Sequence, residues 1–366
     1  MLDTRLHITN GLLESASVWI LESGILEPNG GVARYYRSDT RQNARVSTEI
    51  TGYTLSALRF LHQRGVNQKV LDALNRAALF LTGTAWDRER AIFPFEWEDK
   101  DAGPRSAYFF DCGIITRGLL AAWRTSPNQD YLDVAVACGR AMAIDFRGNE
   151  LFHPILSLPD KSPRPQEPRW SARPGCYQLK AALAWLQLHE LTGEEIFRDA
   201  WEESLDWSLA SHETFLPGDP DHLRVMDRLH AYCYFLEGLL PVLDRQPCVK
   251  AFSEGLDRVS HFLRQISPHF VRSDVYAQLL RARVYAAAAH AIPLDPVAAG
   301  QEANAASTFQ IESADPRVHG AFSFGSKDGS LMPFANPVST MFCMEALTLW
   351  AGCQTPGFQT DWRDLI

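Results

Sequence analysis

Six helix starts that pass from polar to apolar residues recur along the chain, and they constrain its fold more than any other feature. Each opens with Glu, Asp, Tyr, His or Asn and closes in an almost uncharged apolar run. The six runs are EITGYTLSALRFL from Glu49, FDCGIITRGLLAAW from Phe110, GCYQLKAALAWLQL from Gly175, RLHAYCYFLEGLLPVL from Arg228, SDVYAQLLRARVY from Ser273 and NPVSTMFCMEALTLW from Asn336. Helices with one charged face lie between them, for example over residues 71–81 and 197–209. Because a helix that is apolar nearly all round is buried on both sides, the alternation predicts an inner and an outer ring of helices.

The 3.6-residue period of apolar residues predicts roughly twelve helices. They cover residues 6–23, 47–64, 67–83, 107–125, 128–145, 174–192, 194–212, 222–244, 248–266, 273–291, 295–308 and 336–352. Successive inner-helix starts are about 60 residues apart, narrowing to about 50, which is the length of two helices and a loop. The only plausible strands, residues 33–37 and 93–97, lie in connections. We therefore predict an all-α (α/α)6 toroid of six helical hairpins, forming one domain over residues 1–366.

The connections that lead from an outer to an inner helix are long and rich in Pro, Gly, Trp, Arg and acidic residues. They cover residues 24–46, 84–106, 146–173 and 309–335. In the predicted ring all of them reach the end where the inner helices begin. Since long polar-aromatic loops in a compact domain are usually functional, we expect a pocket at that end.

Charge and composition argue against several classes of protein. With a net charge of −9 and no basic run, the chain shows no sign of the positively charged surface that binds nucleic acid or an anionic membrane. No apolar run is long enough to cross a bilayer, and the N-terminus lacks the features of a signal peptide. The seven cysteines include no CxxC pair, which favours reduced thiols. We expect a cytoplasmic protein that binds neither nucleic acid nor membrane.

Three short motifs carry a resemblance to a known superfamily. STEITGY (residues 47–53), FDCG (110–113) and NPVSTMFCMEAL (336–347) look like the inner-helix openings of bacterial proteins of polysaccharide metabolism. The whole layout resembles the (α/α)6 toroids of the six-hairpin glycosidase superfamily and its relatives, the sugar 2-epimerases and uronyl C5-epimerases. The resemblance implies a carbohydrate cleft lined by carboxylates and aromatic residues. The chain departs from several members, because it has no WxxRGNGW-type run, no clear 2-epimerase histidine pattern and no DDxxD or DxDD motif.

Carboxylates are the first candidates for catalysis, because glycoside cleavage uses one protonated and one ionised carboxyl group. Glu49 and Asp111 open the first two inner helices, where a helix N-terminus favours the ionised form that a base or nucleophile needs. Glu96 and Glu98 flank Trp97 in a long loop, where a partly desolvated carboxyl suits a general acid. The alternatives are helix caps for the first pair and a solvated acidic loop for the second.

The sequence DRLHAYCY (residues 227–234) concentrates polar groups at a further inner-helix start. His230 could transfer a proton, and Asp227 or Arg228 could bind sugar hydroxyls. The tyrosines of the inner-helix starts could stack on sugar faces, with core packing as the alternative for each. These tyrosines are Tyr53, Tyr108, Tyr177, Tyr232 and Tyr276.

Arginines at the same predicted end suit a carboxylate ligand, with pairing to Asp and Glu as the alternative. They include Arg105, Arg173, Arg228 and Arg272. We add Asp274 and the loop residues Trp97 and His319 to the candidate substrate-binding set. Glu237 and Glu345 lie deeper in the inner helices, where a charge is usually paired, so we expect structural roles for both.

The sequence favours a carbohydrate-active enzyme, with hydrolysis of an acidic, uronate-containing glycan as the first reaction. Glu49 or Asp111 would be the base, and Glu98 or His230 the acid. The alternatives are a sugar or uronyl epimerase or lyase that uses His230 or a tyrosine, and a catalytically silent glycan-binding protein. No cofactor or metal is expected, and the oligomeric state is left open.

Overall fold

The computed structural model describes residues 2–65, 68–97, 105–149, 151–216 and 222–366. By their internal contacts they divide into two compact units. Unit 1 comprises residues 1–25, 34–44 and 216–366, and unit 2 comprises residues 26–33 and 45–215. The single domain over residues 1–366 stays a prediction.

Unit 2 is built from three helical hairpins in sequence order. Its helices are α2 (Thr48–His62), α3 (Gln68–Leu79), α4 (Phe109–Thr125), α5 (Gln129–Asp145), α6 (Gln178–Thr192) and α7 (Glu195–Phe215). Helix α4 packs between α2 and α6, and each of these three also packs against the helix that follows it. Glycines make the close approach of the inner helices possible: a Cβ added at Gly118 would lie 2.3 Å from the carbonyl oxygen of Gly52. A Cβ added at Gly52 would lie 2.8 Å from Cα of Ile115 in α4, so this position of the first motif also requires glycine.

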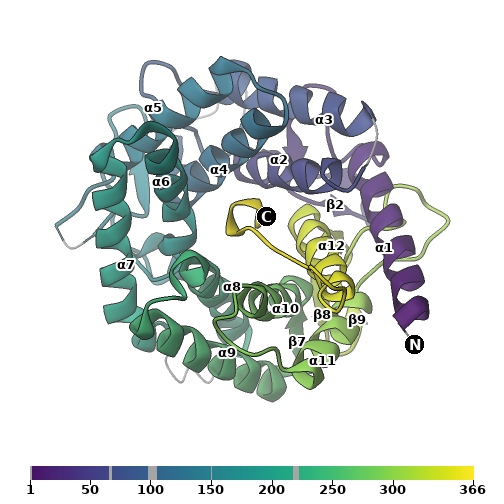
Figure 1. Cartoon of the computed structure of the whole chain (residues 1–366). Coiled ribbons are helices and arrows are strands. Elements are labelled where there is room, and N and C mark those ends of the chain that lie inside the picture. Colours follow the sequence, from purple (N-terminus) through teal and green to yellow (C-terminus); the bar gives the residue numbers. More distant parts are fainter. Residues whose placement is uncertain (1, 66–67, 98–104, 150, 217–221) are drawn as a thin grey trace. The chain divides into compact units, whose positions relative to one another are not determined.

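Unit 1 repeats this arrangement and adds the N-terminal helix. Its helices are α1 (Leu2–Glu22), α8 (His222–Leu239), α9 (Gln246–Ile266), α10 (Ser273–Ala288), α11 (Pro296–Ser307) and α12 (Pro337–Gly352). Helix α10 packs between α8 and α12, while α9 and α11 pack on α8 and α10 from the other side. Helix α1 lies beside α12, so the first and the last α-helix of the chain pack together in this unit (Figure 1).

The helix bounds agree closely with the periodicity of the sequence, and burial follows the predicted division. Side chains of α4 and α10 are buried over most of their length, including Leu119 and Leu279. In α9 only one stripe is buried, with Phe252, Leu256 and Val259 among its residues. The expected inner helices are therefore buried on both sides, and α9 has the single apolar face of a surface helix.

Short strands are the main feature that the periodicity misses. The described residues form β1 (Val32–Ala33), β2 (Tyr36–Arg37), β3 (Gln42–Asn43), β4 (Val46–Ser47), β5 (Ser106–Tyr108), β6 (Ile155–Ser157), β7 (Phe270–Arg272), β8 (Gly325–Lys327), β9 (Ser330–Leu331) and β10 (Phe334–Ala335). The prediction of a strand over 93–97 is wrong, because only an isolated bridge joins Glu96 to Ser47. The strand expected over 33–37 is split between β1 and β2.

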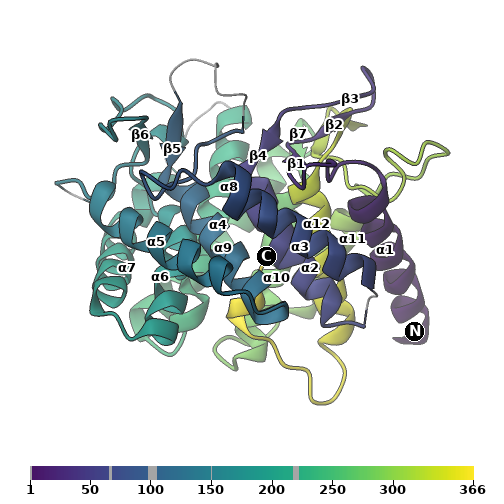
Figure 2. The ribbon, with the colours of Figure 1, turned by 90° about the horizontal axis from the view of Figure 1, so that it is seen from above.

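Four of these strands run directly into inner helices and fix where the helices begin. Strand β4 leads into α2, β5 into α4, β7 into α10 and β10 into α12. Each is paired antiparallel: β1 with β4, β5 with β6, β7 with β8, and β10 with β2. Within unit 2, β4, β5 and β6 lie at one end of the helices, and within unit 1, β2, β3 and β7 do so (Figure 2). Residues at the starts of α2, α4 and α10 are therefore held by paired backbone.

In the described part of the chain, no helix combines the length and the hydropathy needed to cross a bilayer.

Candidate functional site

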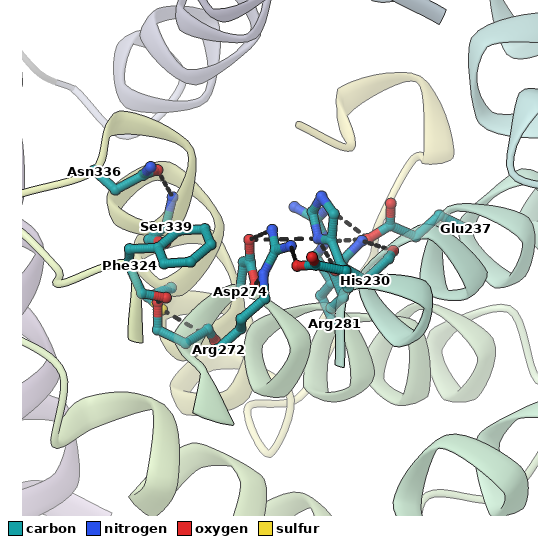
Figure 3. Close-up of polar contacts among 12 residues, drawn as sticks. His230, Glu237, Arg272, Asp274, Arg281, Phe324, Asn336 and Ser339 are labelled. Atoms are coloured by element: carbon teal, nitrogen blue, oxygen red, sulfur yellow. Dashed lines mark hydrogen bonds and ion pairs between the residues drawn. The ribbon is translucent and has the colours of Figure 1, made fainter. Parts of the chain in front are cut away.

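A cluster of polar side chains lies where α8 and α10 begin in unit 1 (Figure 3). Helix α8 contributes Asp227 and His230, β7 contributes Arg272, and α10 contributes Asp274 and Gln278. The antiparallel pairing of β7 with β8 sets the position of Arg272 just before α10. We call these five residues the His230 cluster.

Arg272 is the centre of the cluster's charges. Its Nε and Nη2 donate to the two carboxylate oxygens of Asp274 at 3.1 and 2.7 Å, and Nη1 donates to Asp227 at 3.0 Å. The guanidinium also lies 4.6 Å from the centre of the Phe324 ring. Burial alone would lower the pKa of Arg272. The negative charge of Asp274 outweighs the effect of burial, so the pKa of Arg272 is raised. Burial alone would raise the pKa of Asp274. The positive charge of Arg272 outweighs the effect of burial, so the pKa of Asp274 is lowered. Both groups are ionised at neutral pH.

His230 is held neutral beside this ion pair. Its Nδ1 lies 2.9 Å from Oε1 of Gln278 and 3.4 Å from Oδ2 of Asp274. Its ring packs edge-on against Tyr234, with 4.5 Å between the ring centres. Burial, assisted by the positive charge of Arg272, lowers the pKa of His230 to about 3, against the opposing effect of Asp274. A neutral imidazole has one ring nitrogen able to accept a proton.

A second layer of buried charge lies two helical turns further along α8 and α10. Arg281 donates to Glu237 and to Glu345, each at 2.7 Å, and Tyr285 donates to Glu345 at 3.1 Å. The side chains of Arg281 and both glutamates have no exposed surface. The expectation that Glu237 and Glu345 are paired structural charges is confirmed. The contacts tie α8, α10 and α12 together below the His230 cluster.

Two tyrosines predicted to bind substrate face away from this cluster. Tyr232 is fully buried against α9, because a Cβ added at Gly255 of that helix would lie 3.1 Å from its ring. Tyr276 lies in a groove lined by α9, α10 and α11. Sugar stacking by Tyr232 is therefore corrected to core packing, and Tyr276 is not part of the His230 cluster.

The other two candidates of unit 1 lie at different places. Arg228 is half-buried on α8. His319 is exposed in the connection between α11 and α12, where its Nδ1 accepts from the amide of Ser313 at 3.3 Å. The neighbouring Gly320 approaches the backbone of Ser15 in α1, so this loop packs toward α1.

Unit 2 brings together three candidates where α4 and α6 begin. Asp111 is 4% exposed in the first turn of α4. Tyr177 is also buried; burial, and then the negative charge of Asp111, raise its pKa. Tyr108 also raises the pKa of Tyr177, to a smaller extent, so it lies near the Tyr177 hydroxyl. The hydroxyl of Tyr108 accepts a hydrogen bond from Arg169 at 3.1 Å. A tyrosine with a raised pKa keeps its proton at neutral pH, so the ionised form that a base needs is not present, and Tyr177 is suited to packing or hydrogen bonding.

Two further candidates of unit 2 lie on α2, Glu49 half-buried in its first turn and Tyr53 buried one turn later. The ammonium of Lys180 lies 5.1 Å from the centre of the Tyr53 ring. The half-buried Trp97 packs edge-on against Phe80. Glu98, the predicted acid, lies outside the described residues.

Arg105 and Arg173 are exposed. Nε of Arg173 donates to the carbonyl of Glu167 at 2.8 Å. The backbone carbonyl of Arg173 in turn accepts a hydrogen bond from the hydroxyl of Tyr177 at 3.1 Å.

The sequence reading missed Gln278, Arg281 and Phe324. Gln278 lies one turn after Asp274 and Arg281 lies two turns after it, so a helical count from Asp274 would have identified both. Phe324 lies in a connection and has no such signal. Among the described residues no group of three or more His, Cys, Asp or Glu side chains is placed to hold a metal ion.

Searches by sequence find no matching family model and no matching curated protein. Several solved structures are similar over most of the chain. The cellobiose 2-epimerase from Bacillus thermoamylovorans is 12% identical, with a TM-score of 0.70 over 94% of this chain and 99% of that one. A D-mannose isomerase is 10% identical, with a TM-score of 0.68 over 94% and 97%.

An unsaturated glucuronyl hydrolase from Bacillus sp. GL1 is 13% identical, with a TM-score of 0.66 over 95% of this chain and 96% of that one. Similarity at these identities establishes the fold. The all-α prediction is confirmed: the chain has the (α/α)6 toroid fold of the six-hairpin glycosidase-like proteins.

Proposed function

We propose that this protein is a carbohydrate-active enzyme that moves a proton at a carbon atom of a sugar, as an epimerase or isomerase. His230 is the group that takes and returns the proton. The observation that carries the proposal is a buried imidazole with one ring nitrogen held by Gln278 and a fixed Arg–Asp pair beside it. In such a reaction the base removes the proton next to the carbonyl of the open-chain sugar. The electron pair moves to the carbonyl oxygen, and a proton returns to carbon.

The state of the carboxylates in the His230 cluster favours this reaction over hydrolysis. Hydrolysis requires a protonated carboxyl group as general acid. Asp274 accepts two hydrogen bonds from Arg272 and its pKa is lowered, so it cannot donate a proton at neutral pH. Asp227 is bound to the same guanidinium. Hydrolysis, with Glu49 or Asp111 as the base and Glu98 or His230 as the acid, stays as the alternative reaction.

The hydrogen bonds of Arg272 also favour a neutral sugar over a uronate. A guanidinium has five N–H donors, and two carboxylates occupy three of those of Arg272. The two carboxylates more than balance its charge, so little attraction for a further anion remains. The side chain of Asp227 is 51% exposed and can accept hydrogen bonds from sugar hydroxyls. Among the similar structures, a cellobiose 2-epimerase and a D-mannose isomerase support a neutral sugar, and the unsaturated glucuronyl hydrolase supports the alternative of a uronate.

The test is deuterium exchange at carbon. The protein is incubated in D2O with mannose, glucose, cellobiose or a uronate oligosaccharide, and both C–H exchange and chain length are followed by NMR. We expect exchange at the carbon next to the carbonyl of a neutral sugar. His230→Gln should slow it by about 10²- to 10⁴-fold. His261→Gln, an exposed histidine on α9, is the matched control and should leave the rate unchanged.

Two results would contradict the proposal. Shortened chains without exchange at carbon would identify a hydrolase and direct attention to Glu49 and Asp111. Saturable binding without either change would identify a glycan-binding protein.

A further inference from the structure

We propose that Gln278 is a positioning residue: it fixes the proton of His230 on Nδ1 and leaves Nε2 as the atom that exchanges a proton with substrate. The catalytic consequence rests on the function proposed above. The assignment of the tautomer does not, because it follows from the groups that surround the His230 ring and involves no substrate.

The orientation of the Gln278 amide is the first step. Gln278 contacts His230 twice: its Nε2 donates to the backbone carbonyl of His230 at 3.4 Å, and its Oε1 lies 2.9 Å from Nδ1. A backbone carbonyl can only accept, so the NH2 group must face it, and the amide oxygen must then face the ring. An amide oxygen also can only accept, so Nδ1 has to carry the hydrogen.

The second neighbour of Nδ1 imposes the same tautomer. Oδ2 of Asp274 lies 3.4 Å from Nδ1 and belongs to an ionised carboxylate, which can only accept. Two acceptors therefore face one ring nitrogen. Since a neutral imidazole carries one proton, Nε2 has its lone pair available.

Arg272 explains why the amide and not the carboxylate is the closer partner. It binds both oxygens of Asp274, at 3.1 and 2.7 Å, and so draws that carboxylate away from the imidazole. A carboxylate paired closely with His230 would favour the charged imidazolium, whereas an amide orients the ring without adding charge. The structure thus combines a fixed tautomer with a neutral ring.

The surrounding packing holds this arrangement in place. Gln278 has no exposed surface, and Asp274 is 1% exposed. Both lie on α10, whose Arg281 is anchored to Glu237 of α8 and Glu345 of α12. This anchor fixes how α10 sits against α8, and with it the distance between Gln278 and His230.

The tautomer can be measured directly by ¹⁵N NMR of the full-length protein labelled at histidine. His230→Gln assigns the signals of His230 by their disappearance. We expect the unmodified protein to show a protonated Nδ1 and an unprotonated Nε2 at pH 7. A protonated Nε2 would overturn the proposal without the need for any Gln278 variant.

Gln278→Met tests the role of the amide, because it keeps a similar volume and removes both contacts. We expect a measurable fraction of Nε2-protonated His230, and a 10- to 100-fold fall in kcat for exchange at carbon with KM changed less than about threefold. An unchanged Nδ1-protonated ring in this variant would assign the positioning to Asp274 and overturn the proposal for Gln278. If no sugar shows exchange but the tautomer responds as expected, the proposed function fails, and the assignment of the tautomer to Gln278 stands.

Discussion

The buried imidazole of His230 couples folding to pH. Its pKa in the folded protein is about 3, against an ordinary value of 6.5, because burial and the charge of Arg272 disfavour the protonated form. Below pH 6.5 the unfolded chain takes up a proton that the folded chain does not. The free energy of unfolding therefore falls as the pH drops from 6.5 towards 3. Between pH 7 and pH 4 we expect a loss of about 3 kcal/mol from this residue.

Urea unfolding at pH 7 and pH 4 measures this effect. In His230→Gln the loss of stability between the two pH values should be smaller by that amount. The charged groups facing His230, namely Arg272, Asp274 and Glu237, remain in the variant, so the difference reports the imidazole. His261→Gln should lose as much stability as the unmodified protein. An equal loss in all three proteins would show that His230 is protonated in the folded state.

Side-chain direction decides which of the candidate residues predicted from the sequence lie together in the structure. Residues 227, 230, 272 and 274 were predicted from polar helix starts, and the structure brings these four together. Tyr232 and Tyr276 each come two positions after a cluster residue. Two positions on a helix correspond to a rotation of about 200°, so these side chains point to the opposite face. The presence of polar residues near a helix start does not by itself show which face of the helix each side chain occupies.

At the level of helices, an ion pair between α10 and α11 gives a second pH effect of opposite sign. Nε of Arg283 donates to both carboxylate oxygens of Glu302, at 2.9 and 3.0 Å. Burial raises the pKa of Glu302 to about 7 from 4.5, and Arg283 offsets only part of this. The folded protein holds a proton that the unfolded chain releases between pH 4.5 and 7. The free energy of unfolding should therefore fall as the pH rises through that window, by about 3 kcal/mol at most.

Glu302→Gln removes this titration and keeps an oxygen that can accept from Arg283. We expect the variant to lose less stability than the unmodified protein between pH 5 and pH 8, measured by urea unfolding. Glu254→Gln, on the partly exposed carboxylate of α9, is the control and should behave as the unmodified protein. A steeper loss in Glu302→Gln would mean that the charged pair stabilises the packing of α11 on α10.

The helices could be predicted from sequence and the strands could not, for a physical reason. A helix of four or more turns repeats its apolar face several times, so its period is visible in the sequence. The strands are two or three residues long, which is too short for alternation to show. Their partners are also distant in sequence: Phe334 of β10 pairs with Arg37 of β2. Only the three-dimensional pairing reveals that four inner helices start from a paired strand.

For the whole molecule, the residues that could carry chemistry fall into two groups, one in each unit. Unit 1 holds the His230 cluster with its neutral imidazole and its fixed Arg–Asp pair. Unit 2 holds the carboxylates Glu49 and Asp111 at the starts of α2 and α4. The sequence analysis treated both groups as candidates for one site because both lie at the starts of inner helices. The two groups suit different reactions, proton transfer at carbon for the first and glycoside hydrolysis for the second.

Substitutions in unit 2 separate these reactions in the complete protein. If His230 carries the proton, we expect Glu49→Gln and Asp111→Asn to change kcat for exchange at carbon by no more than about threefold. His230→Gln, measured beside them, should lower kcat by about 10²- to 10⁴-fold. Circular dichroism checks that the buried Asp111 can be replaced without unfolding the chain. A loss of kcat in either carboxylate variant as large as that of His230→Gln would mean that proton transfer requires unit 2, and the assignment to the His230 cluster alone would be wrong.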